Sequence, residues 1–239
     1  MPTLEVCFTP DLYSNKHTED KHVTIVIDVL RATTAMCTAL EYGIKAIIPV
    51  AEIEELKSLK KLGYLIASER EGLKLSFADF GNSPFDFMNS DLKGQIIAYS
   101  TTNGTRAIDM ITEGSSEIYI AAYSNISAMC DFLISKNENV VIVCSGWKNK
   151  FSLEDALISG AFCEMLLKNG KFTTICDSST ASIGLWNLAK NDIIEYSKKC
   201  IHSQRLKKLK LDDCIEYCFT ADTTKVVPMV IDGMIQNIK

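Results

Sequence analysis

An aspartate, an arginine and two threonines follow a short apolar run near the start of the chain. The run covers residues 23–27, and the polar residues after it are Asp28, Arg31, Thr33 and Thr34. Consecutive apolar and β-branched residues are typical of a buried strand, and the periodic apolar residues after Thr34 predict a helix. Ligands of open α/β sheets bind at such strand-to-helix turns. These residues therefore predict either a ligand site or simply the cap of a helix.

A second apolar run, residues 95–99, leads into a denser group of polar residues. That group is Thr101, Thr102, Asn103, Gly104, Thr105 and Arg106, directly before a predicted helix. Hydroxyls, a glycine and an arginine at a helix N-terminus are typical of a phosphate-binding loop. The GxxxxGK[ST] pattern of nucleotide-binding P-loops is absent. Because a helix cap needs only one such residue, the segment favours anion binding.

A third strand, over residues 140–143, ends at Cys144 and is followed by Lys148 and a helix that begins near residue 152. Ser152 and Asp155 have the spacing of a capping box, with Asp in place of the usual Glu. Glu154 is left in the first turn, where it faces either solvent or the site. Cysteine phosphatases need an arginine six residues after their nucleophile, and a lysine stands there, so Cys144 is a poor candidate.

Residues 68–89 interrupt the alternation of strands and helices with a charged, aromatic segment. It is too long for an ordinary connection, which favours a functional loop or a short strand pair. Glu69, Glu71 and Asp79 surround Arg70 in the sequence. Metal or substrate binding and a solvated acidic surface both remain open for this group. Near the C-terminus, His202 adds a titratable side chain.

The order of the predicted elements indicates an α/β fold with a mainly parallel or mixed sheet flanked by helices. No low-complexity linker divides the chain, so residues 1–239 are predicted to form one compact unit, with a weak boundary between two lobes near 136–139. Residues 226–231, with Pro228 inside, are predicted to form a terminal edge strand.

The composition excludes several classes of protein. A net charge of −5 argues against a broad nucleic-acid-binding surface, but an anionic small molecule needs only a local positive pocket. The chain has only four arginines, and three lie in the polar segments above. Nine cysteines without a CxxC pair predict buried free thiols in a reducing cytoplasm. No segment is apolar enough to span a bilayer, and the apolar content permits a homo-oligomer without requiring one.

Four motifs in order make a family resemblance specific. DVLRATT at 28–34, GNSP at 81–84, TTNGTRA at 101–107 and FSLEDA at 151–156 together resemble the 2-phosphosulfolactate phosphatase family of coenzyme M biosynthesis. The resemblance covers residues 23–230. It implies a magnesium-dependent phosphatase that converts 2-phosphosulfolactate to 3-sulfolactate and phosphate, with an α/β fold unlike those of the common phosphatase superfamilies.

Such a substrate carries phosphate, carboxylate and sulfonate on three carbons, so its site needs several positive groups. Mg²⁺ prefers oxygen ligands and retains water; the expected ligands are Asp28 first, then Glu69, Glu154 and Asp155. Arg31, Arg106 and the backbone N–H groups of residues 102–105 are expected to hold the phosphoryl oxygens. Arg70 or Lys148 would take the sulfonate or carboxylate, and His202 would protonate the leaving alkoxide.

Three alternatives stay open at this point. Asp28 could itself attack phosphorus, but aspartyl-phosphate enzymes usually present DxD and Leu30 stands at the second position; we favour metal-activated water. The chain could hydrolyse another phosphorylated hydroxyacid. It could also be a small-anion-binding protein without catalytic activity.

Overall fold

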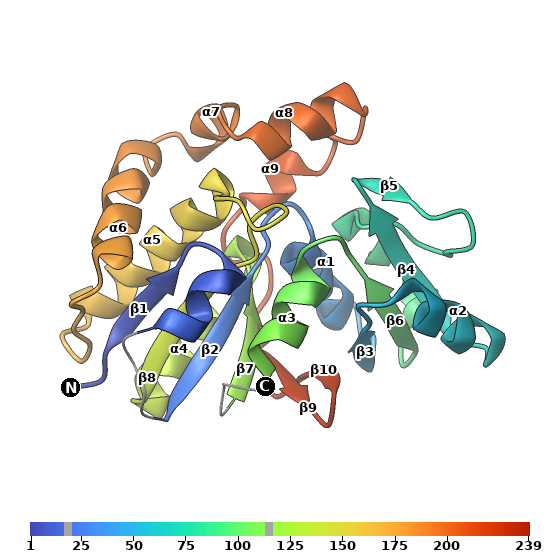
Figure 1. Ribbon diagram of the computed structural model, residues 1–239, viewed down its shortest axis with the longest axis horizontal. Coiled ribbons are helices and arrows are strands. Elements are labelled where there is room, and N and C mark those ends of the chain that lie inside the picture. Colours follow the sequence, from blue (N-terminus) through green and yellow to red (C-terminus); the bar gives the residue numbers. More distant parts are fainter. Residues whose placement is uncertain (17–20, 113–116) are drawn as a thin grey trace.

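Ten strands of the described chain form one mixed sheet, in the order β1-β8-β2-β7-β9-β10-β3-β6-β4-β5 (Figure 1). The computed structural model describes residues 1–16, 21–112 and 117–239. The strands are β1 (Leu4–Cys7), β2 (His22–Ile27), β3 (Ala46–Pro49), β4 (Leu65–Arg70), β5 (Leu73–Lys74), β6 (Ile96–Ser100), β7 (Glu117–Ala121), β8 (Asn139–Cys144), β9 (Pro228–Ile231) and β10 (Met234–Asn237). The predicted α/β class and mixed sheet are confirmed.

Two parallel groups of strands make up most of the sheet. In one group β8 pairs with both β1 and β2, and β2 pairs with β7, all in parallel. In the other, β6 pairs in parallel with β3 and β4. The antiparallel hairpin β9–β10 joins the groups, because β9 pairs with β7 and β10 pairs with β3. The sheet is therefore continuous only because the C-terminal hairpin lies between the two parallel groups of strands.

This position corrects the prediction that residues 226–231 form an edge strand. Met229 pairs with Tyr119 of β7 on one side, and Val230 pairs with Ile235 of β10 on the other. Pro228, which lacks an N–H, is tolerated because it is the first residue of the strand. The sequence pattern gave no sign of β10, so the second neighbour of β9 was missed.

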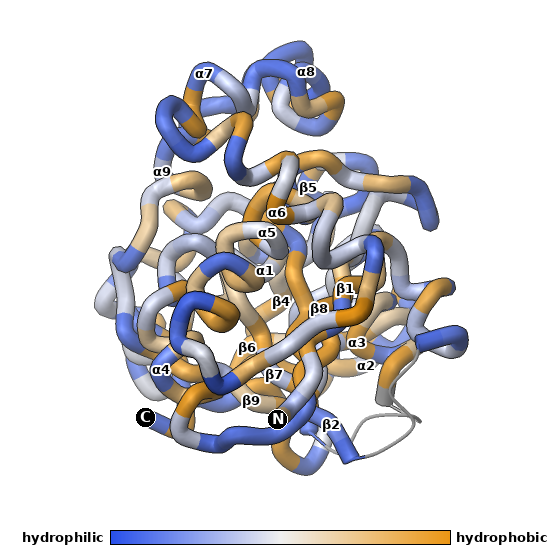
Figure 2. The backbone as a smooth tube through the Cα atoms, turned by 90° about the vertical axis from the view of Figure 1, so that its left-hand side faces the viewer, coloured by the Kyte–Doolittle hydropathy of each residue, from blue (hydrophilic) through white to orange (hydrophobic). Residues whose placement is uncertain are grey.

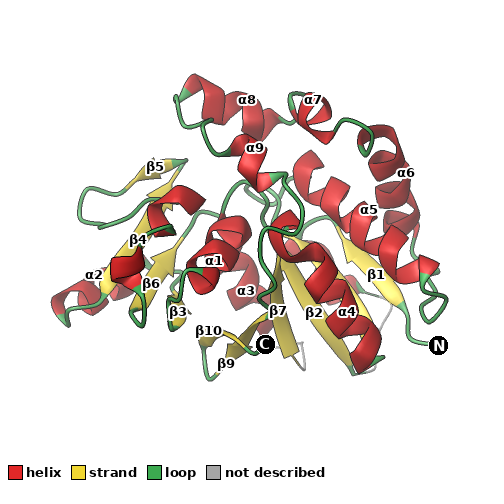
Figure 3. Cartoon of the chain, turned by 180° about the vertical axis from the view of Figure 1, so that it is seen from behind, coloured by secondary structure: helices red, strands yellow, loops and turns green. Residues whose placement is uncertain are grey.

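Helices cover both faces of the sheet (Figure 3). The α-helices are α1 (Ala32–Glu41), α2 (Ile53–Lys61), α3 (Gly104–Thr112), α4 (Ile126–Lys136), α5 (Leu153–Lys168), α6 (Asp177–Ala189), α7 (Ile193–Ser197), α8 (Ile201–Lys208) and α9 (Ile215–Cys218). Short 3-10 helices lie at Pro10–Asn15, Pro84–Phe87, Ser90–Leu92 and Tyr123–Asn125. Among the described residues, no helix has the length and apolarity needed to cross a membrane.

Strand β2 divides the core between the two faces of the sheet. Ile25 and Ile27 belong to the cluster that includes α4 and α5, while Val26 belongs to the cluster that includes α1 and α3. Alternate residues of a strand point to opposite faces, and β2 is buried on both. Figure 2 shows the hydrophobic segments running through the middle of the molecule, where the strands lie. All nine cysteines are buried free thiols, as the sequence predicts.

The C-terminal helices form a layer of their own above the strand ends. Figure 1 shows α7, α8 and α9 crossing over the ends of the strands, with the β4–β5 hairpin beside them. Glu69 of β4 pairs with Lys74 of β5 in antiparallel register, so the charged segment contains the predicted strand pair. Residues 136–139 are the turn between α4 and β8; their role as a boundary between lobes stays a prediction, as does the single compact unit.

Close contact between α5 and α6 depends on one glycine. A Cβ atom on Gly160 would lie 2.0 Å from the carbonyl oxygen of Ser182 and 2.8 Å from Cβ of Trp186. A Cβ on Gly184, in the facing helix, would meet no atom within 4 Å. The two helices can therefore approach each other only because residue 160 lacks a side chain.

We predict that Gly160→Ala lowers the free energy of unfolding by about 1–3 kcal/mol, because backbone must move to admit the methyl group. Gly184→Ala is the matched control and should raise it by about 0.5–1 kcal/mol, since alanine favours a helix. Urea unfolding of both variants measures the difference. Equal stability of the two variants would contradict the close packing described here.

Candidate active site

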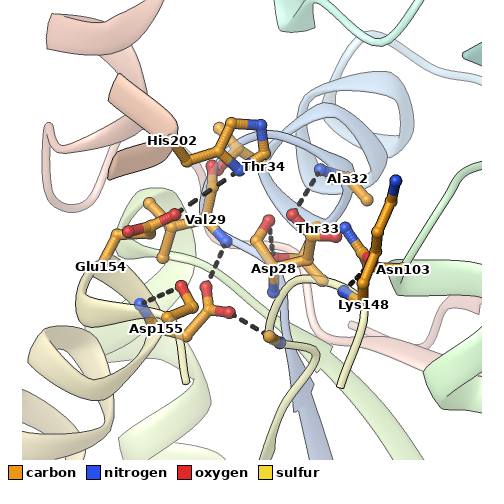
Figure 4. Close-up of polar contacts among 12 residues, drawn as sticks. Asp28, Val29, Ala32, Thr33, Thr34, Asn103, Lys148, Glu154, Asp155 and His202 are labelled. Atoms are coloured by element: carbon orange, nitrogen blue, oxygen red, sulfur yellow. Dashed lines mark hydrogen bonds and ion pairs between the residues drawn. The ribbon is translucent and has the colours of Figure 1, made fainter. Parts of the chain in front are cut away.

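The loops after β2, β6 and β8 meet at one place, which is lined by residues from distant parts of the sequence (Figure 4). The backbone N–H of Lys148, after β8, donates to Asn103 Oδ1, after β6, at 3.1 Å. The backbone N–H of Val29, after β2, donates to Asp155 Oδ1 at 3.0 Å. These three polar loops therefore lie at one edge of the sheet.

Asp28 lies at the bottom of this site and is only 7% exposed. Its Oδ1 accepts a hydrogen bond of 3.3 Å from the Ala32 N–H at the start of α1, and its backbone is held by Thr33. Oδ2 has no hydrogen-bond partner among the described residues. A Cβ on Gly104 would lie 3.2 Å from Oδ2, so the N-terminus of α3 closely approaches this oxygen.

Burial raises the pKa of Asp28 from 3.8 to about 6, although nearby His202 partly offsets the effect. Asp155 is also buried, and its pKa is raised first by burial and then by the charge of Asp28. Two carboxyl groups in one poorly solvated place disfavour each other's ionisation. The site therefore contains negative charge that a cation would stabilise.

Asp155 is fully engaged with backbone donors. Its Oδ1 accepts from the Val29 N–H, and its Oδ2 accepts from the Gly146 N–H at 3.2 Å. Ser152 Oγ accepts from the Asp155 N–H at 3.4 Å, which is one half of the predicted capping box. The carboxylate thus ties α5 to the loops after β2 and β8.

Glu69 plays a similar part on the other side of the site. Its Oε1 accepts from the Thr102 N–H at 2.7 Å, and its Oε2 accepts from the Gly72 N–H at 2.5 Å. Thr102 Oγ1 in turn accepts from the Glu71 N–H at 3.2 Å. The buried Glu69 carboxylate therefore binds the β4–β5 hairpin to the loop after β6.

The hydroxyls of the threonine loop differ in what they contact. Thr101 and Thr105 bond to each other's backbone: Thr105 N–H donates to Thr101 Oγ1, and Thr101 N–H donates to Thr105 Oγ1, at 3.2 and 3.1 Å. This reciprocal pair begins α3. Thr102 and Asn103 instead line the pocket. The loop therefore contains a helix cap as well as pocket-lining groups.

Arg31 is buried under the site, with 3% of its surface exposed. Its guanidinium donates to the Gly72 carbonyl at 3.3 Å and to Cys214 Sγ at 3.7 Å. A hydrogen bond from Cys218 and the charge of Arg31 lower the pKa of Cys214 to about 6, against the effect of burial. The arginine that follows β2 is thus anchored to the hairpin and to α9.

His202 and Lys148 are each paired with a carboxylate. His202 Nδ1 lies 3.5 Å from Oε1 of Glu154, which is buried in the first turn of α5. Lys148 Nζ lies 2.7 Å from Oε1 of Glu71. The structure therefore places Glu154 inside the site, beside the histidine, rather than in solvent.

Arg70 and Arg106 have different surroundings from those expected. The Arg70 guanidinium donates to the carbonyls of Glu69 and Ala51 and to Ser100 Oγ. Arg106 is exposed on α3. Neither is among the described residues that line the pocket, and their roles in substrate binding stay predictions.

The structure also adds residues that sequence reasoning missed. The pocket around Asp28 is lined by Asp28, Leu30, Arg31, Glu69, Glu71, Gly72, Asn82, Thr102, Asn103, Trp147, His202 and Arg205. Its volume is about 10 Å³, roughly the room that one water needs. Trp147 and Arg205 were missed. Arg205 had a weak signal in the sequence, because arginine is rare in this chain and Arg205 closely follows His202.

Comparison with known proteins identifies the family. A family model described as 2-phosphosulpholactate phosphatase matches residues 7–233. The chain belongs to the 2-phosphosulfolactate phosphatase family. A relative named probable 2-phosphosulfolactate phosphatase from Thermotoga maritima is 39% identical over 210 residues, 88% of this chain and 89% of the relative. Proteins with the same name from Caldanaerobacter subterraneus subsp. tengcongensis and Clostridium acetobutylicum are 34% and 35% identical, covering 98% and 88% of this chain and 98% and 90% of their own lengths.

Membership in this family places the chain among the phosphoric monoester hydrolases, as the sequence predicted, and raises the question of a metal ion. Among residues 1–16, 21–112 and 117–239, no three His, Cys, Asp or Glu side chains are grouped so that they could hold one. Both oxygens of Glu69 and of Asp155 already accept backbone N–H groups. Asp28 keeps one oxygen without a partner. The site therefore fits a metal that takes one protein carboxylate and completes its shell with water and phosphate, as Mg²⁺ does.

We predict that Asp28→Asn makes the metal-free protein more stable at neutral pH. The folded protein holds the Asp28 proton up to about pH 6, whereas an unfolded aspartate loses it near 3.8. Stability is therefore lost as the pH rises between these values, and the loss is complete above pH 6. Asparagine keeps an oxygen for the Ala32 N–H, so the gain in unfolding free energy should be about 1–2 kcal/mol at pH 8 and should shrink toward pH 4.

Asp79→Asn is the control, because we expect it to change the free energy of unfolding in the opposite direction. Asp79 is partly buried, but its pairing with Lys60 outweighs that burial and lowers its pKa. Its variant should be less stable than the unmodified protein at pH 8. Chemical denaturation with a chelator, at several pH values, measures both. A destabilised Asp28→Asn protein at pH 8 would show that the Asp28 charge is well compensated.

Proposed function

We propose that the chain hydrolyses 2-phosphosulfolactate to 3-sulfolactate and phosphate with the help of Mg²⁺. The observation that carries the proposal is the buried Asp28 carboxylate, with one oxygen unpartnered, where the loops after β2, β6 and β8 meet. Membership in the family and the names of its relatives support the choice of substrate.

In this proposal the phosphoryl group lies beside Asp28 and faces the N-terminus of α3. The N-terminus of a helix carries free N–H groups and a partial positive charge, which favour a phosphate. Gly104 lets this end of α3 approach Asp28 without a Cβ atom between them. Arg31 is buried and also lines the pocket, so it adds a full positive charge near the phosphoryl group.

Asp28 would hold the metal, and we favour water as the nucleophile. Bound Mg²⁺ would neutralise phosphate charge and lower the pKa of a coordinated water. The raised pKa of Asp28 has burial as its first cause, and an adjacent cation would lower that pKa by favouring the ionised form. Direct attack by Asp28 remains the alternative, which oxygen-isotope incorporation from labelled water into phosphate or enzyme would distinguish.

His202 protonates the leaving alkoxide. Glu154 fixes Nδ1 of the imidazole at 3.5 Å, which leaves Nε2 to carry a proton to the substrate.

The same site would accept other phosphorylated hydroxyacids, so that activity is the alternative function. The proposal places the enzyme in the cytoplasm, in coenzyme M biosynthesis. Nine buried free thiols are typical of a reducing compartment, which supports the cytoplasmic location.

We predict phosphate release from 2-phosphosulfolactate that needs Mg²⁺ and is lost on chelation. Asp28→Asn should lower kcat by at least about 100-fold, because the metal loses its charged ligand. Asp79→Asn, which removes a carboxylate outside the Asp28 pocket, should retain activity. Phosphate release by a colorimetric assay measures all three proteins.

Two results would contradict this function. Hydrolysis of other hydroxyacid phosphates but not of the sulfonated ester would keep the reaction and change the substrate. Binding of 3-sulfolactate or phosphate by the folded protein, without release of phosphate from any ester, would favour the anion-binding protein.

A further inference from the structure

One cation in the pocket has no acceptor among the described residues. Arg31 donates to Gly72 and Cys214, Lys148 is paired with Glu71, and His202 is paired with Glu154. The side chain of Arg205 makes no hydrogen bond or ion pair in the part of the chain that the structure describes. Arg205 is partly buried, and its N–H donors are therefore available to an anionic ligand.

The Arg205 side chain is positioned by an aromatic ring. Its Cζ atom lies 4.8 Å from the ring centre of Trp147. Trp147 is held by a tight turn, in which its backbone and that of Lys150 exchange two hydrogen bonds of 3.0 Å. A guanidinium that lies over an aromatic ring contacts the ring with its flat face. The N–H groups at the edge of the guanidinium then stay available for an oxyanion.

Arg205 also lies between two cavities. It lines the small polar pocket that contains Asp28, together with Trp147 and His202. The same three residues line an adjoining cavity of about 480 Å³. Because the two cavities adjoin at these three residues, a three-carbon substrate whose phosphate lies at Asp28 can extend toward Arg205 and the larger cavity.

The larger cavity favours a weakly hydrated anion. Its apolar wall is formed by Trp147, Phe151, Leu153 and Ile201. A sulfonate spreads one charge over three oxygens and loses less hydration free energy beside such a wall than a carboxylate does. Guanidinium is likewise weakly hydrated and presents several donors in a plane.

We propose that Arg205, stacked on Trp147, binds the sulfonate of the substrate and sets the preference for a sulfonated ester. The inference rests on the proposed function, and it assigns to Arg205 the part that the sequence suggested for Arg70 or Lys148. The phosphate lies at Asp28 and the sulfonate at the opening of the larger cavity. The carboxylate then stays near the small pocket.

The test compares Arg205→Met, Arg205→Lys and Lys208→Met on three esters. Lys208→Met is the matched control, because it removes an exposed cation from the same helix. The esters are 2-phosphosulfolactate, 2-phosphomalate, which has a carboxylate in place of the sulfonate, and 2-phospholactate, which has a hydrogen there and keeps only the carboxylate common to all three. Steady-state kinetics give kcat and KM separately.

For Arg205→Met we expect KM for 2-phosphosulfolactate to rise about 10- to 100-fold, the usual effect of losing hydrogen bonds to a charged group. Its kcat, and both constants for 2-phospholactate, should change by less than about threefold. Arg205→Lys should recover part of the loss, and Lys208→Met should behave as the unmodified enzyme. For the unmodified enzyme, 2-phosphomalate should be a poorer substrate than the sulfonated ester.

Three outcomes would overturn the proposal. Equal losses on 2-phosphosulfolactate and 2-phospholactate would mean that Arg205 contacts the phosphate. Equal use of the sulfonated and carboxylated esters would remove the preference itself. If no ester is hydrolysed, the proposed function fails; calorimetric binding of 3-sulfolactate that Arg205→Met abolishes would still support this assignment, and absence of binding would refute it.

Discussion

The site depends on two buried carboxylates that accept backbone N–H groups from neighbouring loops. Glu69 holds Thr102 and Gly72, and Asp155 holds Val29 and Gly146. Charge-assisted hydrogen bonds of this kind are strong when shielded from water. Asp155 fixes the loops after β2 and β8 to each other, and Glu69 fixes the loop after β6 to the β4–β5 hairpin, although these segments are far apart in the sequence.

Both oxygens of Glu69 and of Asp155 accept backbone N–H groups. Of these three acids, Asp28 is therefore the one with a carboxylate oxygen available to a ligand. It lies at the centre of the same group, so its ionisation is opposed by burial and by the charges of Glu69 and Glu154. Ionisation of Asp28 is therefore electrostatically unfavourable without a compensating cation. A bound cation and phosphate would relieve this cost, which couples ligand binding to the stability of the loops.

The C-terminal helices complete the site from above. Helix α8 brings His202 next to Glu154 and Arg205 over Trp147, and α9 brings Cys214 next to Arg31. In the proposed reaction, this layer would supply the sulfonate-binding and proton-donating groups, while the loops of the sheet would hold the phosphate. The β9–β10 hairpin, which follows α9, returns the chain to the middle of the sheet and anchors this layer.

The sequence by itself determined the α/β class and most strands, because consecutive apolar runs followed by polar turns are local patterns. It also predicted a ligand site at Asp28 and phosphate binding by residues 101–106, and both stay predictions. It did not show that β9 is an interior strand, since a strand's neighbours are set by long-range pairing. Nor did it distinguish the carboxylates that hold loops from the one left for a ligand, because Asp28, Glu69 and Asp155 look alike until their hydrogen-bond partners are known. The placement of Arg205 on Trp147, through the packing of α8 over the loop after β8, was decided only by the tertiary structure.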